Sequence, residues 1–344
     1  MQRNLEIDTL RGFACVLLVS FHVVGVNAEM GLHLPPEHWL QQLNGALAYL
    51  RMPLFSFLSG YVYAFRPFRA GQSDARGFIQ GKMRRLLLPM LTVGTIFALM
   101  QNAMPGANQH VTNWWMLHIV PVAHFWFLEA LFIIFMLLVA LEQWRLLATP
   151  QRFAGVWALT VLAFVFLDVT PYFAANGAVY LMPFFLAGLA CQRFELRSVP
   201  ARWLATAVLG LACLWLAALP QPLGQGLSLP GLLAGLSVAF LLLRSGWRWP
   251  ALAYVGSFSF AIYLMHVFFT AASRIAFNRL GLMDVYVLFG LGTLLGIAGP
   301  MLAALLIGRS ARLKLWLLGE APAALPGSRA IGLDEARLSG LPPN

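Results

Sequence analysis

Hydrophobic and polar positions alternate along this chain in whole segments rather than residue by residue. A membrane-spanning α-helix needs about 20 apolar residues, because the hydrocarbon core of a bilayer is about 30 Å thick. Windows of this kind recur along the sequence and are separated by short stretches with Arg, Pro, Gly or Asn. They predict ten spanning helices, at residues 10–28, 45–65, 86–104, 121–141, 153–168, 177–192, 203–219, 227–243, 251–271 and 285–307.

Composition supports an all-α, polytopic integral membrane protein. Of the 344 residues, 60% are hydrophobic and only 10% are charged, which excludes a soluble globular domain of ordinary composition. The net charge is +10, but in a membrane protein the places of the basic residues carry more information than their sum. We therefore expect the lipid bilayer, and no nucleic acid, as the surrounding partner.

The basic residues fix an expected orientation. If the N-terminus is cytoplasmic, all but three of the 23 Lys and Arg residues fall in cytoplasmic segments, the exceptions being Arg51, Arg274 and Arg279. Loops rich in Lys and Arg stay in the cytoplasm. We expect both termini to be cytoplasmic and the chain to lie in the bacterial inner membrane.

One membrane domain, residues 1–316, is expected to be followed by a disordered cytoplasmic tail at 317–344, which is rich in Pro, Gly and Ala. Val26 to Ala28 resemble a signal-peptide cleavage site. However, Glu6 and Asp8 make the preceding segment unlike the basic start of a signal peptide, so the first helix is expected to be retained.

The cysteines indicate neither a disulfide framework nor a metal site. All three lie inside apolar segments without the spacing of metal ligands: Cys15, Cys191 and Cys213.

The first predicted helix carries the clearest candidates for chemistry. Arg11 and His22 are eleven residues apart, which on an ideal helix is about three turns plus 20° and about 16 Å of rise. They share one face, and His22 is expected beyond the middle of the membrane. Asp8 lies one turn before Arg11 and can orient it.

Two interpretations of this pair stay open. Desolvation disfavours imidazolium, so a buried His22 would be neutral and able to accept a proton from a hydroxyl. Arg11 could instead be a cytoplasmic anchor, and His22 a partner in an interhelical hydrogen bond.

Further intramembrane polar residues are candidates for the same site. His266 lies in the outer half of the ninth helix, and His124 opens the fourth, with Trp126 beside it and Glu129 about 7 Å deeper. A structural pair for Glu129 and an interfacial aromatic belt around Trp126 are the alternatives.

The second predicted helix adds a cation and two small residues. Arg51 lies near its outer end and could hold an anion, pair with Glu129 or extend to the membrane surface. Ser59 and Gly60 permit close helix packing, which is the alternative to a role in the site.

The second cytoplasmic loop contains six basic residues in a short span: Arg66, Arg69, Arg76, Lys82, Arg84 and Arg85. Such clusters commonly set topology or contact anionic lipid. Beside a cavity they would also suit a polyphosphorylated ligand, because guanidinium groups match phosphate oxygens.

These motifs together resemble a known family. The chain contains, in order, "LRG", "MPLFSFLSGY", "RRLLLP", "FWFLEALF", "PFFLAG" and "GSFSFAIYLMH", spread over residues 4 to 270. This order resembles the integral membrane acyltransferase family 3, in the branch that includes glycan O-acetylases and periplasmic glucan succinyl transferases.

The resemblance implies an enzyme with ten membrane helices. It would transfer an acyl group, usually acetyl, from cytoplasmic acyl-CoA to a hydroxyl of a cell-surface, lipid-linked or periplasmic glycan. Arg11 and His22 correspond to the family's essential residues. The remaining correspondences are Ser59 with Gly60, Tyr263 with His266, and Lys82, Arg84 and Arg85 with a pair of arginines in the loop. This loop departs from the family pattern, since Lys82 stands where the first arginine is expected.

The resulting hypothesis divides the site into three parts. His22 is the general base, with Arg11, His266 and Ser59 as further catalytic residues. Acyl-CoA, the donor substrate, is expected at Arg11, Arg69, Lys82, Arg84 and Arg85, and no permanently bound cofactor or metal is expected. The acceptor is expected at Arg51, His124, Trp126, Glu129 and Tyr263. A proton-coupled transporter or flippase, with His22, Arg51, His124 and Glu129 along its pathway, is the alternative.

Overall fold

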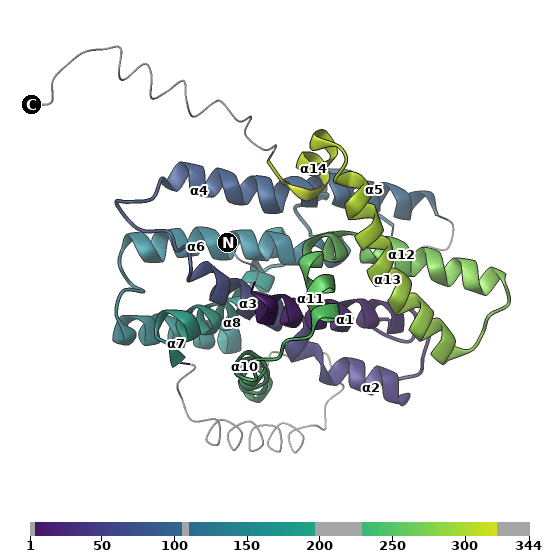
Figure 1. Ribbon diagram of the computed structural model, residues 1–344, viewed down its shortest axis with the longest axis horizontal. Coiled ribbons are helices and arrows are strands. Elements are labelled where there is room, and N and C mark those ends of the chain that lie inside the picture. The colour runs from purple at the N-terminus through teal and green to yellow at the C-terminus, as the bar shows by residue number, and fades with distance from the viewer. Residues whose placement is uncertain (1–3, 105–109, 197–228, 322–344) are drawn as a thin grey trace, which may run out of the picture.

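The computed structural model describes residues 4–104, 110–196 and 229–321. Within these residues every regular element is helical, and most helices lie along the long axis of the molecule (Figure 1). The α-helices are α1 (Leu5–Val24), α2 (Trp39–Ala46), α3 (Ala48–Tyr63), α4 (Ala75–Lys82), α5 (Leu88–Ala103), α6 (Trp126–Gln143), α7 (Pro150–Phe166), α8 (Ala175–Arg193), α10 (Leu229–Arg244), α11 (Pro250–Ser257), α12 (Ser259–Arg279), α13 (Val285–Ile307) and α14 (Ala311–Leu318). A π-helical turn, η1 (Met83–Leu87), and three 3₁₀ turns, η2 (Trp114–Met116), η3 (Ala123–Phe125) and η4 (Tyr172–Ala174), complete the described elements.

Helix length and composition identify a multi-pass membrane protein. Six helical segments in the described residues are long and apolar enough to cross a membrane: Leu5–Val24, Ala75–Ala103, Ala123–Gln143, Tyr172–Arg193, Ser259–Arg279 and Val285–Ile307. Two shorter apolar helices, α7 and α10, accompany them. The number ten and the orientation of the termini remain predictions. The expected helix at 203–219 lies outside the described residues, as does the tail from residue 322.

The basic segment before α5 is helical, which the sequence analysis did not anticipate. Asp74 caps α4, and α4, η1 and α5 form one continuous helix (Figure 1). Pro89 lacks an N–H and crowds the carbonyl four residues before it, so the regular α-helical pattern cannot continue through this point. The π-helical turn, in which Leu88 N–H bonds to Met83 O, precedes Pro89 and includes Arg85.

The expected single helix at 251–271 is divided in two. Phe258 has φ −102° and ψ 9°, outside the helical range, and it separates α11 from α12. In Figure 1, α11 crosses the direction of its neighbours and packs on α1, whereas α12 continues along the bundle. The break allows one segment of chain to contact two different parts of α1.

Reciprocal glycine contacts bring α3 against α8. A Cβ built on Gly60 would lie 1.9 Å from the Phe185 carbonyl oxygen, and one built on Gly188 would lie 1.9 Å from that of Phe57. Only glycine permits this backbone approach, which is typical of membrane helices that associate through small residues. Gly60 therefore has the packing role that the sequence analysis kept as an alternative.

Reciprocal glycine contacts also join α1 to α11. A Cβ on Gly12 would lie 1.9 Å from the Leu252 carbonyl oxygen, and one on Gly256 would lie 1.8 Å from that of Asp8. The contact fixes the first half of α1 beside the break at Phe258. It thereby sets the position of α12 relative to α1.

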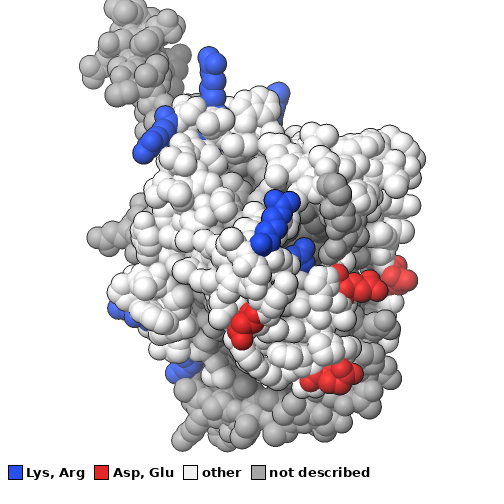
Figure 2. All heavy atoms as spheres, turned by 90° about the vertical axis from the view of Figure 1, so that its right-hand side faces the viewer, with Lys and Arg blue, Asp and Glu red and all other residues white. Residues whose placement is uncertain are grey.

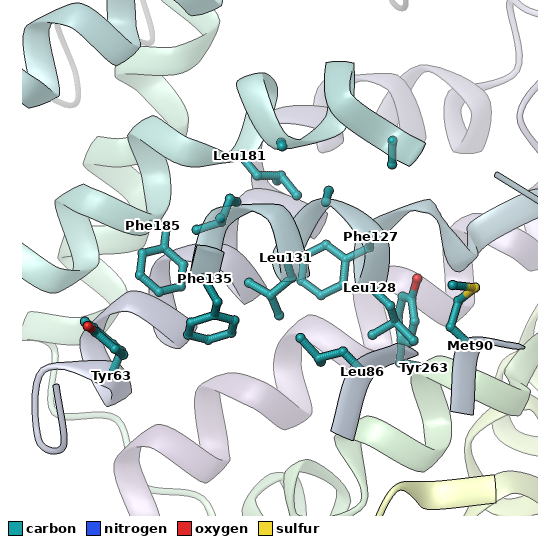
Figure 3. Packing of buried hydrophobic residues seen from close by; sticks show 14 of the residues in the cluster. Tyr63, Leu86, Met90, Phe127, Leu128, Leu131, Phe135, Leu181, Phe185 and Tyr263 are labelled. Atoms are coloured by element: carbon teal, nitrogen blue, oxygen red, sulfur yellow. The ribbon is translucent and has the colours of Figure 1, made fainter. Parts of the chain in front are cut away.

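The main buried cluster follows α6. Figure 3 shows its side chains in a row along this helix, from Tyr63 and Phe185 at one end to Met90 and Tyr263 at the other. Residues from α5, α8 and α12 pack on α6 in this cluster. The candidate chemistry therefore sits against a closely packed helix, and not on a mobile surface loop.

Replacing Gly188 by alanine should destabilise the protein. The new methyl group would meet a backbone oxygen that cannot rotate away, so α3 and α8 must separate, at a cost of about 1–3 kcal/mol or more. Thermal unfolding of purified protein in detergent micelles measures the effect. Gly290→Ala is the matched control, because a Cβ there meets nothing within 4 Å. Equal melting temperatures for the two variants would contradict the close contact.

Candidate functional site

Two cavities enter the bundle from opposite ends of α1. The first, here called the Arg11 cavity, has a volume of about 780 Å³ and is lined by residues at the start of α1 and the end of α3, including Asn4, Arg11 and Arg66. The second, the Arg51 cavity, has a volume of about 600 Å³ and is lined by residues at the end of α1 and the start of α3, including His22 and Arg51. One helix therefore contributes to both cavities.

The sequence of α1 explains how it serves both. The side chain of Asn4 accepts hydrogen bonds from Glu6 and Ile7 N–H, which starts the helix before its charged turn. Arg11 NH1 lies 3.3 Å from Asp8 Oδ1 one turn earlier, and both side chains line the Arg11 cavity. The expected orientation of Arg11 by Asp8 is present in the structure.

Three histidine rings meet where the cavities approach each other. His22 comes from α1, His124 from η3 and His266 from α12. The ring centroids are 4.7 Å apart for His22 and His266, 4.8 Å for His124 and His266, and 5.8 Å for His22 and His124. The sequence marked each histidine separately, and the fold places them in one cluster.

Hydrogen bonding defines the tautomers of two of these rings. His266 Nδ1 lies 2.9 Å from the carbonyl oxygens of both Ile262 and Tyr263. Carbonyls only accept, so Nδ1 carries the proton, and the Nε2 lone pair is buried with no hydrogen-bond partner among the described residues. His124 Nε2 donates to the Leu264 carbonyl oxygen at 3.4 Å. Its Nδ1 lone pair is likewise buried with no hydrogen-bond partner among the described residues. Both neutral rings can accept a proton or a hydrogen bond.

His22 is the least buried member of the cluster and, like His124, lines the Arg51 cavity. Its ring lines the Arg51 cavity and contacts the edge of Phe21, with no hydrogen bond to another described residue. Behind it lies His266, which is fully buried. An imidazole so placed is available to a group that enters the cavity, as the role of general base requires.

Tyr263 stands at the boundary between the cavities. Its side chain lines the Arg11 cavity, its hydroxyl donates a hydrogen bond to the backbone carbonyl of His124, and its ring centroid lies 5.5 Å from that of His124. Figure 3 shows it beside Leu128 and Phe127 at one end of the buried cluster. Tyr263 therefore links the lining of the Arg11 cavity to His124, which lines the Arg51 cavity.

The Arg11 cavity collects three of the five basic groups expected for the donor, together with Arg66, and excludes the other two. Arg11, Arg66, Lys82 and Arg85 line it. Arg69 and Arg84 are exposed and line neither cavity. Arg66 belongs to the same loop, but the sequence analysis did not select it for the site.

Lys82 and Arg85 have aromatic contacts in this cavity. Lys82 Nζ lies 3.5 Å from the ring centroid of Phe135. The Arg85 guanidinium lies 4.4 Å from the Phe260 ring, and its NH1 donates to Leu318 O at 2.7 Å. Cation–π contacts hold a charge in place without neutralising it. Both groups are therefore held at the wall of the cavity.

The segment after α13 also reaches the Arg11 cavity. Glu320 Oε1 lies 3.3 Å from Arg85 NH1, and Oε2 lies 3.1 Å from Lys314 Nζ. Partial burial opposes ionisation of this carboxyl, but Lys314 and Arg85 hold its pKa below its ordinary value. Residues 319–320, assigned to a disordered tail by the sequence analysis, thus contact the site.

Ser59 and Glu129 lie near the centre with different partners. Ser59 lines the Arg11 cavity, and its hydroxyl donates to Phe55 O at 2.7 Å. Glu129 is buried in α6, and neither of its carboxylate oxygens has a hydrogen-bond partner among the described residues. The ion pair with Arg51 that the sequence suggested is absent from these residues.

The Arg51 cavity gathers three of the five residues expected for the acceptor, but Glu129 and Tyr263 do not line it. Arg51 is 8% exposed, lies 3.7 Å from the Phe21 ring centroid, and donates from NH1 to Asn44 O and Oδ1 at 2.6 and 2.8 Å. His124 and Trp126 line the same cavity. Gln101, Tyr180 and Arg274 also line it. The sequence analysis did not select Gln101 and Tyr180, because they lie on separate helices, and it placed Arg274 in an outer loop. No cluster suited to a metal ion occurs in the described residues.

Tyr263→Phe should destabilise the boundary between the cavities. The substitution removes the hydroxyl that donates to the buried His124 carbonyl, at a cost of about 1 kcal/mol. Thermal unfolding should show a lower melting temperature than wild type. Tyr254→Phe, at an exposed position of α11, should show no change. Equal melting temperatures for the two variants would mean that the Tyr263 hydrogen bond contributes nothing to stability.

Comparison with known proteins identifies a family. A family model described as an acyltransferase domain matches residues 4–308. The match covers α1 to α13 and includes all three histidines and both cavities. No curated protein and no solved structure gives a significant match.

Proposed function

Since the chain belongs to the membrane acyltransferase family 3, whose acyltransferase domain it matches over residues 4–308, we propose that it transfers an acyl group from acyl-CoA to a hydroxyl of a glycan. The donor occupies the Arg11 cavity, the acceptor occupies the Arg51 cavity, and they meet at His22. The observation that carries this proposal is the cluster of three histidines between a basic cavity and a second cavity at the opposite end of α1.

The basic lining of the Arg11 cavity supports a donor site. Arg11, Arg66, Lys82 and Arg85 offer guanidinium and ammonium groups that match the phosphates of coenzyme A. The phosphates bind here, and the pantetheine arm extends toward Tyr263 and the histidines. The rise of about 16 Å from Arg11 to His22 suits such an extended arm. Arg69 and Arg84 remain outside this cavity.

The chemistry follows from the lone pair of His22. His22 takes the proton of the acceptor hydroxyl while the oxygen attacks the thioester carbonyl. The C–O ester bond forms, the C–S bond breaks, and the proton passes from His22 to the departing CoA thiolate. The buried Nε2 lone pair of His266 stabilises and orients the transient imidazolium. Ser59 or Tyr263 can donate to the oxyanion once its hydroxyl turns away from the carbonyl that it bonds at rest. Attack on an acylated enzyme residue is the alternative route.

The finer features of the hypothesis belong to this proposal. The acyl group is acetyl, and the acceptor is a cell-surface, lipid-linked or periplasmic glycan. Ten spanning helices hold both termini in the cytoplasm of a bacterium, so the Arg11 cavity faces cytoplasmic acetyl-CoA. Membership of an acyltransferase family favours this reading over the transporter alternative.

His22→Gln should abolish transfer while donor binding is retained. Glutamine keeps polarity and similar size but cannot act as a base, and a general base contributes about 10²–10⁴-fold to rate. Release of free CoA thiol in the presence of acceptor measures transfer, and stabilisation by acetyl-CoA in thermal unfolding measures binding. An unchanged rate would remove His22 from the mechanism.

Arg11→Gln and Lys82→Gln should each weaken acetyl-CoA binding by about tenfold, because each removes one charge facing the phosphates. Dissociation constants from thermal shifts provide the test. Arg309→Gln is the matched control, since Arg309 is an exposed cation that lines neither cavity. Equal affinity for all three variants would place the donor elsewhere.

A further inference from the structure

The Arg51 cavity contains positive charge without a carboxylate to balance it. Arg51 and Arg274 both line it, and within the described residues no Asp or Glu does. Neither arginine forms an ion pair among these residues. A buried cation without an anionic partner is costly, so such groups are typically kept for a ligand.

Arg51 has hydrogen-bond donors available for a ligand. All of its hydrogen bonds to described residues come from NH1 and go to Asn44. A guanidinium has five N–H donors, so NH2 and Nε remain for a ligand. The Phe21 ring under the guanidinium fixes its plane, and Phe21 precedes His22 in α1. An anion bound to Arg51 would therefore lie close to the proposed base.

Arg274 supplies a second cation from a different helix. It is half-buried in α12, two turns after His266, and its NH1 donates to Gly31 O at 2.8 Å. As with Arg51, only one nitrogen is used within the described residues. Charges from α3 and α12 thus converge on one space, which is the arrangement needed to bind a carboxylate or phosphate.

The surface at this end of the molecule is consistent with an anionic ligand. Figure 2 shows basic side chains beside a hollow near the middle of the face, with acidic side chains below them. The basic side chains next to the hollow favour the approach of a negative group.

We infer that the Arg51 cavity selects an acceptor that carries an anionic group, a carboxylate or phosphate, beside the hydroxyl to be acylated. The inference rests on the proposed function and specifies its substrate class as acidic glycans. The donor's phosphates are assigned to the Arg11 cavity, so they do not satisfy Arg51 or Arg274. The other source of an anion is a dicarboxylic acyl group, whose free carboxylate would extend beyond His22.

The two arginines could instead have a structural role, which predicts a different effect on acceptor selectivity. Arg274 holds Gly31 in the loop after α1, and Arg51 holds Asn44, whose Nδ2 bonds Gly25 O in the same loop. If they served only the loop, their loss would impair neutral and charged acceptors equally. Selectivity between matched acceptors therefore separates the two roles.

The test uses wild-type protein and Arg51→Gln in lipid nanodiscs with two matched pairs of probes. Methyl glucuronide is paired with methyl glucoside, and glycerol phosphate with glycerol. Thermal shifts report binding, and release of CoA from acetyl-CoA reports transfer. We expect at least one charged probe to bind wild type tenfold more tightly than its neutral partner, and Arg51→Gln to remove that preference. Arg279→Gln, an exposed cation outside the cavity, should keep it.

Equal behaviour of both members of each pair in wild type would overturn the inference, as would an Arg51→Gln variant that kept the charge preference. A third arm compares succinyl-CoA with acetyl-CoA. If Arg51→Gln removed a preference for succinyl-CoA and left the acceptors unaffected, the anion would belong to the acyl group and the acceptor assignment would be wrong.

Failure of the proposed function has its own signature, because it would abolish CoA release from every donor and acceptor pair. Binding of the charged probes, read from the thermal shifts, would still report whether the Arg51 cavity takes an anion.

Discussion

The contact among the imidazole rings of His22, His124 and His266 is the interaction on which the proposed activity depends. Three elements distant in the sequence must converge for these rings to lie within 4.7–5.8 Å of one another. Two of the rings donate their protons to backbone carbonyls, and their buried lone pairs have no partner in the part of the chain that the structure describes. Buried polar groups without partners are costly, and they persist where a function uses them. Because the cluster lies between the proposed donor and acceptor cavities, we assign these lone pairs to proton transfer during the proposed acyl transfer.

Backbone packing secures this convergence. The glycine contacts between α1 and α11, and between α3 and α8, set helix separations that a single methyl group would disrupt. The break at Phe258 then directs α12 along the bundle so that His266 reaches His22. Positioning by rigid helices gives the site a geometry that loops would not maintain.

The sequence predicted the individual helices better than the contacts between them. Apolar windows located the long helices of the described residues, because the bilayer imposes a minimum length of apolar chain. The spacing of Arg11 and His22 predicted their separation, because both lie on one helix. Residue spacing fixes relative positions only within one helix, so it could not predict that His22 and His266, on different helices, lie together. Nor could it distinguish Lys82 and Arg85, which line a cavity, from Arg69 and Arg84, which are exposed. The π-helical turn before Pro89 and the carboxylate of Glu320 at Arg85 likewise depend on tertiary packing.

The central claim is that donor and acceptor enter from opposite ends of α1 and react between the two cavities. Proteoliposomes of known orientation test it directly, with acetyl-CoA supplied only on the side of Arg11 and the acceptor only on the side of Arg51. The account predicts free CoA in the first compartment and acylated acceptor in the second. Product that formed only when both substrates shared one compartment would contradict it.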